Sequence, residues 1–143
     1  MRLSTAGRYA LRAMVDLAQR DSQEPIQRVS IAERQGISDQ YLAQLFVKLR
    51  RAGLVESTRG PGGGYALAQS PAQITAGDVL RAVEEEVDPV PCASDEDRFH
   101  CDRLDVCPTH WLWAKLGGAI TSVLDSVTLL DLCEQATFGE ENR

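Results

Sequence analysis

The sequence lacks the features that carry a chain out of the cytoplasm or into a membrane. It has no apolar run long enough to span a bilayer, and Arg8 and Arg12 interrupt the N-terminal stretch that could have been a signal core. We therefore expect a cytoplasmic protein with no membrane partner. In a reducing compartment its four cysteines are expected to be metal ligands or core residues rather than disulfide partners.

Histidine is scarce as well, which limits the chemistry the chain can perform. His100 and His110 are the only two, and both lie close to cysteines. No nucleophile stands beside a base in the manner of a catalytic pair. We therefore expect a protein that is not an enzyme and has no small-molecule substrate.

A net positive charge is also missing, although the charges are unevenly distributed. The formal net charge is −6, yet residues 1–60 carry ten Lys or Arg against six Asp or Glu, whereas the remaining 83 residues carry five against fifteen. A chain that binds a polyanion with one end only has this distribution. Chance asymmetry explains this charge distribution equally well. The prediction of DNA binding therefore rests on the motifs.

Residues 1–60 contain the pattern of a helix–turn–helix. We expect a first helix over 5–20, capped by Thr5. Ser30 and Glu33 have the spacing of a capping box that begins a second, short helix. Gly36 then supplies the turn, where a positive φ is often required.

Ser38 is expected to cap the next helix, over 38–53. Its apolar side chains recur at the spacing of one buried face: Leu42, Leu45, Phe46 and Leu49. The opposite face would enter the major groove of DNA, where Gln40 and Gln44 can each form paired hydrogen bonds to adenine. Ala43 lies between them and could contact a thymine methyl group.

Residues 54–67 indicate a β-hairpin, because two strand-like stretches flank the glycine-rich segment RGPGGG. A hairpin directly after a helix–turn–helix is a wing, and its narrow tip would let Arg59 approach a minor groove or phosphates. The segment lacks the Gly-Lys-Ser/Thr ending of a nucleotide-binding loop. The outward face of the helix over 38–53 has residues that are also common on ordinary solvated helices. The wing therefore adds independent support for DNA binding. The expected DNA-binding set is Ser38, Gln40, Tyr41, Ala43, Gln44, Lys48, Arg51, Arg59 and Gly60.

Residues 88–107 have little periodicity and are expected to form a loop that binds metal. Three thiolates and one imidazole can make such a site in a cytosolic protein, and the spacing is neither C-x-x-C nor that of a bacterial ferredoxin. An iron–sulfur cluster, a zinc ion and unligated cysteines all stay open on these grounds, and His100 is an alternative imidazole ligand. The candidate ligands are Cys92, Cys101, Cys107 and His110.

A long helix is expected over 110–127, and a short last helix begins at Thr128. Cys133 in the short helix is expected to be a buried small hydrophobe. Trp111 and Trp113 are expected to pack in the core or at the dimer interface, or to shield a cluster from water. The long helix carries an apolar seam with no matching helix elsewhere in the chain, which predicts a homodimer. The seam residues are Leu112, Leu116, Ala119, Val123 and Val127.

Four stretches together resemble the IscR family of iron–sulfur cluster regulators: MRLSTAGRYALRAM, ERQGIS with YLAQLF, RGPGGGY and CPTHWLW. The resemblance implies a homodimeric winged-helix repressor and activator of iron–sulfur assembly genes. It also implies a 2Fe–2S cluster on Cys92, Cys101, Cys107 and His110. The gap from Cys92 to Cys101 is longer than in that family, and Ala43 replaces an expected acidic residue.

The expected fold class is therefore mainly α with a small β-hairpin wing, a winged helix–turn–helix followed by a long dimerisation helix. We divide the chain into a DNA-binding region over 1–84, a cluster-binding loop over 85–110, a dimerisation helix over 111–127, and a short helix and tail over 128–143. The expected partners are double-stranded DNA and a second copy of the chain. Alternatives are a regulator that senses nitric oxide or iron supply, and a zinc-binding or electron-transfer protein.

Overall fold

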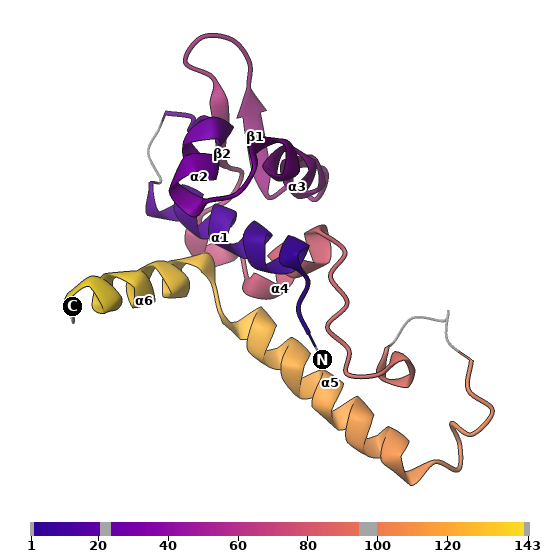
Figure 1. The fold of residues 1–143 in the computed structure, drawn as a ribbon. Helices are drawn as coiled ribbons and strands as arrows, with labels where there is room; N and C mark the ends of the chain where they lie inside the picture. The colour runs from indigo at the N-terminus through magenta and orange to yellow at the C-terminus, as the bar shows by residue number, and fades with distance from the viewer. Residues whose placement is uncertain (1, 21–23, 95–99, 142–143) are drawn as a thin grey trace.

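The computed structural model describes residues 2–20, 24–94 and 100–141 of the 143-residue chain (Figure 1). This arrangement of helices with a two-stranded hairpin confirms the expected fold class. In chain order the elements are α1 (Thr5–Gln19), α2 (Arg28–Gln35), α3 (Asp39–Arg51), β1 (Val55–Thr58), β2 (Gly64–Leu67), η1 (Pro71–Gln73), α4 (Ala76–Ala82), η2 (Pro91–Ala93), α5 (Pro108–Ser126) and α6 (Leu129–Glu141).

The starts of α1 and α2 differ from the sequence expectation. The side chain of Ser4, not Thr5, accepts the hydrogen bond from the backbone N–H of Gly7 at 3.2 Å. Helix α2 begins at Arg28, so Ser30 lies inside it and the predicted capping box is wrong. The reason is tertiary, because the preceding segment bridges to β2 and the chain turns into the helix directly after that bridge.

The turn between α2 and α3 follows the prediction. Gly36 ends α2 in the left-handed conformation, with a φ of 64° that a side chain would oppose. The hydroxyl of Ser38 then caps α3 by accepting a hydrogen bond from the backbone N–H of Tyr41 at 3.1 Å. These two residues fix the angle at which α3 leaves α2.

The hairpin is an antiparallel pair in which Val55 lies opposite Leu67 and Thr58 opposite Gly64. Ile26 extends it by exchanging backbone hydrogen bonds with Tyr65, at 2.8 and 2.7 Å. The tip needs glycine at position 63, because a Cβ there would collide with the carbonyl oxygen of Thr58. The wing is therefore anchored to the body at its base and closed tightly at its tip.

One hydrophobic core joins α1, α2, α3, α4, the base of the hairpin and the start of α6. Leu129 of α6 is fully buried in this core, so the C-terminal helix packs with the N-terminal elements. The largest fully buried apolar side chains are Met14, Leu17, Ile31, Leu42, Phe46, Leu49, Ile74, Val79, Leu80 and Leu129.

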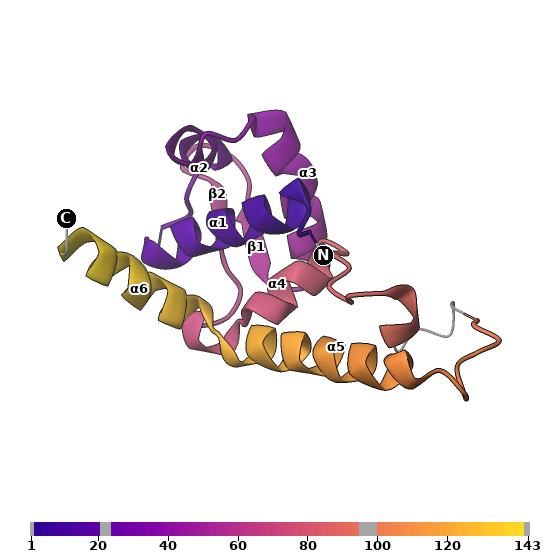
Figure 2. The same cartoon turned by 60° about the horizontal axis from the view of Figure 1, so that its bottom comes forward.

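Helix α5 is held to α4 at its C-terminal end, and its N-terminal end points away from α1, α2, α3 and the hairpin (Figures 1 and 2). Arg81 of α4 pairs with Asp125 at 2.8 Å. Gly77 leaves room for that carboxylate, which a Cβ would strike. Gly117 is the one residue of α5 that is buried. No helix within the described ranges is both long and apolar enough to cross a membrane.

Candidate nucleic-acid interface and cysteine site

Helix α3 presents polar side chains on the face opposite the core. Gln40, Gln44 and Arg51 are exposed there, while the small side chain of Ala43 is half-buried. Ser38 is exposed at the N-terminus, although its hydroxyl is occupied as the helix cap. Two amide side chains one turn apart, followed by a guanidinium, form a row of hydrogen-bonding groups along one line of the helix.

The first turn of α3 is fixed by an ion pair with α2. Arg28 donates two hydrogen bonds to the carboxylate of Asp39, from Nε at 2.7 Å and from a terminal nitrogen at 3.2 Å. The guanidinium holds the pKa of the Asp39 carboxyl below its usual value. Paired bonds of this kind fix orientation as well as distance, so α3 keeps a defined rotation about its axis.

A second ion pair network lies behind the helix–turn–helix. Asp16 of α1 is only 1% exposed and accepts hydrogen bonds from Arg34 at 2.7 and 3.0 Å and from Gln35 at 2.9 Å. Burial by itself would raise the pKa of Asp16, but these hydrogen bonds and the charges of Arg34 and Arg20 lower it below its usual value. The network therefore ties α2 to α1 through a buried charge that is paired.

Two of the predicted DNA-binding residues already have partners in the protein. Tyr41 is half-buried and stacks edge-on against Tyr9, with ring centroids 6.0 Å apart. Lys48 forms an ion pair with Glu84 at 3.1 Å. Glu84 follows α4 and is the only described residue other than glycine with a positive φ, at 60°. The ammonium group of Lys48 is therefore already paired with a carboxylate of the protein.

The sequence reasoning missed two residues on this side of α3. Val47 is 48% exposed although it is apolar, and Arg50 is exposed beside Arg51. Together with Phe46 and Tyr65 they line a shallow hollow between α3 and β2. Helical spacing could have placed Val47 on the outward face, since it lies three residues after Gln44 and four before Arg51.

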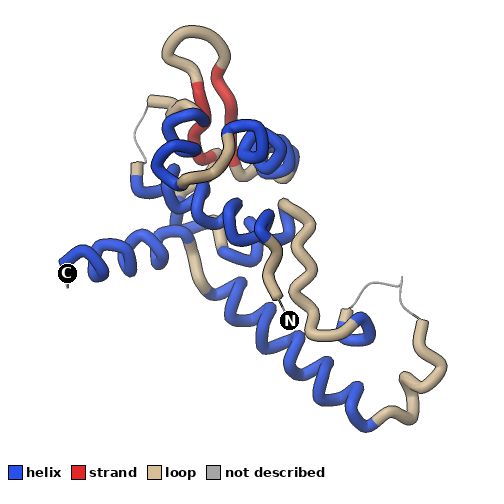
Figure 3. Tube along the Cα trace, viewed as in Figure 1, coloured by secondary structure: helices blue, strands red, loops and turns tan. Residues whose placement is uncertain are grey.

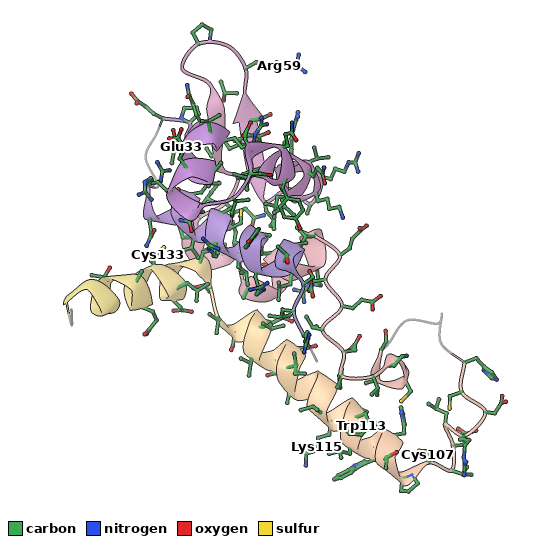
Figure 4. All side chains as sticks on the ribbon, viewed as in Figure 1. Glu33, Arg59, Cys107, Trp113, Lys115 and Cys133 are labelled. Atoms are coloured by element: carbon green, nitrogen blue, oxygen red, sulfur yellow. The ribbon has the colours of Figure 1, made fainter. Side chains whose placement is uncertain are left out.

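The wing lies beside α3, and both lie far from the N-terminal end of α5 (Figure 3). Arg59 follows β1 and points away from the body of the molecule (Figure 4). Within the described residues its guanidinium has no ion-pair or hydrogen-bond partner. Gly60 is exposed with a φ of 90°. The structure therefore presents Arg59 and the outward face of α3 as two polar surfaces of the same end of the molecule.

The candidate metal ligands come from two elements and the segment between them. Cys92 lies in η2, Cys107 is the N-cap residue of α5, and His110 lies in the first turn of α5, as predicted. A Cβ on Gly117 would lie 3.5 Å from Pro89 and 3.6 Å from Ala93, so η2 packs against α5 two turns beyond His110. Cys101 follows residues 95–99, which are outside the described ranges.

His110 has a feature that the fold itself does not explain. Its Nδ1 is buried, and it is the one such side-chain nitrogen or oxygen in the described residues without a hydrogen-bond partner. A buried polar atom without a partner is costly unless something absent from the protein satisfies it. The three thiols are half-buried and free of disulfides. This set of donors fits a metal ion or a cluster that prefers sulfur and imidazole.

His100 has a different environment. It is 91% exposed, and its Nε2 lies 3.0 Å from the carboxylate of Asp102. Cys107 has a hydrogen-bond partner in its own helix, because its sulfur lies 3.1 Å from the hydroxyl of Thr109. The hydrogen bonds from Thr109 and from the backbone of His110 lower the pKa of the Cys107 thiol. Cys133 packs against the core, and burial raises the pKa of its thiol.

The structure does not bring the candidate ligands together. Within residues 2–20, 24–94 and 100–141, no three His, Cys, Asp or Glu side chains are close enough to hold a metal ion. What the fold does establish is proximity of elements, since η2 and the first turns of α5 lie side by side (Figures 1 and 2).

The apolar seam of α5 is open to solvent in the single chain. Leu112 is 46%, Leu116 39% and Val123 61% exposed. Trp111 is also exposed and lies under the ammonium group of Lys115, 5.1 Å from the ring centroid, whereas Trp113 is half-buried. Trp111 is thus not a core residue of the single chain.

The known proteins that this chain is similar to are transcriptional regulators. A model of the Rrf2 family, described as iron-dependent transcriptional regulators, matches residues 3–135. The chain is 48% identical over 132 residues to the HTH-type transcriptional regulator IscR of Vibrio cholerae. The match covers 92% of this chain and 75% of that protein.

Two solved structures share the fold over almost the whole chain. IscR of T. potens is 41% identical with a TM-score of 0.76, and the match covers 95% of this chain and 88% of that one. CymR of B. subtilis, described as the global cysteine regulator, is 38% identical with a TM-score of 0.75, and covers 94% of this chain and 98% of that one.

Proposed function

This chain belongs to the Rrf2 family of iron-dependent transcriptional regulators, and we propose that a 2Fe–2S cluster controls which DNA sites it binds. The proposed ligands are Cys92, Cys101, Cys107 and His110. The observation that carries the proposal is the buried, unpartnered Nδ1 of His110 beside the N-cap cysteine of α5. The family and the relatives are transcriptional regulators rather than enzymes, and we assign this one to the cytoplasm and to iron–sulfur assembly genes.

The DNA-binding surface of the proposal is the outward face of α3 together with the wing. Gln40 and Gln44 would read adenine in the major groove, Arg51 would bind phosphate, and Arg59 would enter the neighbouring minor groove. The ion pair of Arg28 with Asp39 holds α3 in one rotation. A helix that is already oriented loses little conformational freedom on binding.

The proposed function also includes a homodimer that forms through α5. The exposed leucines and Val123 form a seam that is not covered in the single chain, and pairing two such seams would bury it. Trp111 would then lie at or near the interface. Two-fold symmetry places two copies of α3 on one duplex, so the target is expected to be palindromic, with half-sites about one helical turn or a multiple apart.

The cluster, when bound, supplies reversible one-electron chemistry and sensitivity to oxidants. The residues of the chain determine what this does to DNA binding. His110 and Cys107 begin α5, η2 packs on its side, and α5 is tied to α4 by Arg81 and Asp125. A cluster bound by Cys92, Cys101, Cys107 and His110 would therefore act on the helix that spaces the two DNA-binding regions of the dimer.

The experiment measures iron, sulfide and zinc per chain in anaerobically purified protein, together with its visible spectrum. Binding to short duplexes is then measured by gel shift before and after exposure to air. We expect iron and sulfide in equal amounts, a brown protein, and a change of DNA-site preference in air. Bound zinc without sulfide, together with DNA binding that does not change in air, would contradict cluster control. Only the assignment as a DNA-binding protein would then remain.

A further inference from the structure

Val47 is an apolar side chain in the centre of the surface assigned to DNA. Gln40, Gln44, Val47 and Arg51 follow one another at spacings of four, three and four, so they form a single line along α3. Leu42 and Leu49, on the other side of the helix, are fully buried. Val47 therefore faces outward between an amide and a guanidinium.

The surroundings of Val47 make it a rigid contact with open space beside it. A β-branched side chain in a helix is nearly confined to one χ1 rotamer. The hollow next to it is backed by Phe46, which is fully buried, and by Tyr65, whose ring centroid lies 4.3 Å from that of Phe46. A small apolar group can enter beside Val47 without displacing any core residue.

A single exposed valine is ordinary on a protein surface. The exposure of Val47 is informative because of its position on the face of α3 assigned to the major groove. In the major groove most groups on the base edges are hydrogen-bond donors or acceptors, and the 5-methyl group of thymine is the apolar exception. A valine pressed against a donor or acceptor would remove water from it without replacing the hydrogen bond. Beside glutamines suited to adenine, whose partner base is thymine, the matching group is that methyl.

We propose that Val47 reads the 5-methyl group of one thymine in each half-site. The inference rests on the proposed function, because it requires α3 to lie in the major groove. One helical turn is about 5.4 Å and one base-pair step about 3.4 Å, so the thymine lies about one to two base pairs beyond the base that Gln44 contacts. Val47 thus adds specificity at a position where α3 offers no hydrogen bond.

Replacement of thymine by uracil tests this, because the exchange removes the methyl group and leaves base pairing intact. The probe is a palindromic duplex that the purified dimer selects from a random-sequence library. Each thymine is replaced by uracil in turn, in both half-sites at once, and the dissociation constant is measured. We expect one position at which uracil weakens binding by about three- to tenfold per half-site, the effect of losing one buried methyl group.

The variant Val47→Ala should bind the thymine duplex more weakly and should no longer distinguish thymine from uracil at that position. Its responses at all other thymines should equal those of the wild type. Val29→Ala is a matched control, because Val29 is also 48% exposed but lies on α2, and it should keep the full wild-type uracil profile. Thermal unfolding of all three proteins checks that the fold is unchanged.

The outcomes separate the two proposals. A wild-type protein that selects a duplex but has no uracil-sensitive position overturns the role of Val47 and leaves the proposed function standing. A Val47→Ala variant that keeps every uracil-sensitive position of the wild type also overturns it, because other residues, such as Ala43, then contact those methyl groups. Failure to select any duplex, in the cluster-loaded and cluster-free states alike, overturns the proposed function and this inference with it.

Discussion

The DNA-binding body and the cysteine segment of this protein are held together by different means. The DNA-binding body, α1 to α4 with the hairpin and the start of α6, is organised by a shared core and by paired charges such as Asp16 with Arg34. The cysteine segment, residues 84–110, has no buried apolar side chain within its described residues. We therefore expect the body to fold without a ligand, and a bound ligand to stabilise mainly the cysteine segment.

The largest expected effect is the loss of the cluster from the cysteine segment. Cys92→Ala, Cys101→Ala and Cys107→Ala should each abolish the brown colour and the bound sulfide, because the cluster needs each thiolate as a ligand. The thermal unfolding midpoint of the apo-protein should not change, because the core of the body contains none of these residues. Iron and sulfide analysis with circular dichroism measures both.

Cys133→Ala is the matched control, because Cys133 is a free cysteine outside the segment and should leave the cluster intact. Similarly, His110→Ala should leave a labile cluster, while His100→Ala should have little effect. A cysteine variant in the segment that unfolds the apo-protein would show that the two regions are not independent.

The second-largest expected effect is a loss of folding stability in the DNA-binding body. Asp16→Asn should lower the free energy of unfolding by about 2–3 kcal/mol, because it leaves Arg34 without its charged partner. The pKa of Asp16 is lowered by folding, so the ionised group stabilises the native state at neutral pH. This contribution should be present above about pH 4, the ordinary pKa of a free Asp, and should be lost as the pH falls through the lower folded-state pKa.

Urea unfolding from pH 2 to pH 7 measures this contribution as the gap between the wild type and Asp16→Asn, which should close at low pH. Arg20→Ala is the control, because Arg20 is exposed and lies 3.5 Å from the carboxylate, and it should change stability by less than about 1 kcal/mol. Equal losses for both variants would show that the paired bonds from Arg34 have no special weight.

The same contrast explains how much the sequence could predict. In the body, local chemistry was enough where the signal lies within one turn. Ser38 and Gly36 are such cases, and Thr128 is another, since it exchanges hydrogen bonds with Asp131 at the start of α6. The prediction for Ser30 was wrong because a contact from a distant strand sets the start of α2.

The interface residues show a second limit. The partners of Tyr41 and Lys48 lie 32 and 36 residues away in the chain, so helical periodicity does not reveal them. Val47 was left out of the outward face, which was predicted from polar side chains and Ala43, although its spacing places it there. In the cysteine segment, the residue types indicate the ligands but their irregular spacing does not predict an arrangement, and the part of the chain that the structure describes contains no three such side chains close enough to hold a metal ion.

A smaller effect is expected at the wing. Arg59→Ala should weaken binding to the selected duplex by about 1–3 kcal/mol, because a guanidinium in a narrow minor groove meets an enhanced negative potential. Gln44→Ala should instead reduce discrimination between duplexes more than overall affinity. Gel shifts at physiological salt measure both, and unchanged affinity of Arg59→Ala would exclude the wing as a DNA contact.

The smallest effect concerns the junction of the two regions. Glu84 begins the cysteine segment and pairs with Lys48 of α3, and Glu85 accepts a hydrogen bond from the backbone N–H of Ser4 at 2.8 Å. Glu84→Gln removes the charge that competes with phosphate for the lysine. We expect DNA affinity to rise by about twofold, and log K to fall more steeply with log salt by up to about 0.9 for the added phosphate contact.

Glu86→Gln separates this pairing from a general effect of charge, because it removes the same charge two residues further along, where Glu86 is exposed. A specific competition predicts a steeper salt dependence for Glu84→Gln alone, and none when Lys48→Gln is combined with it. Equal gains for both glutamate variants would mean that the acidic segment repels DNA at a distance. The direct contact between the cysteine segment and α3 would then have no part in DNA binding.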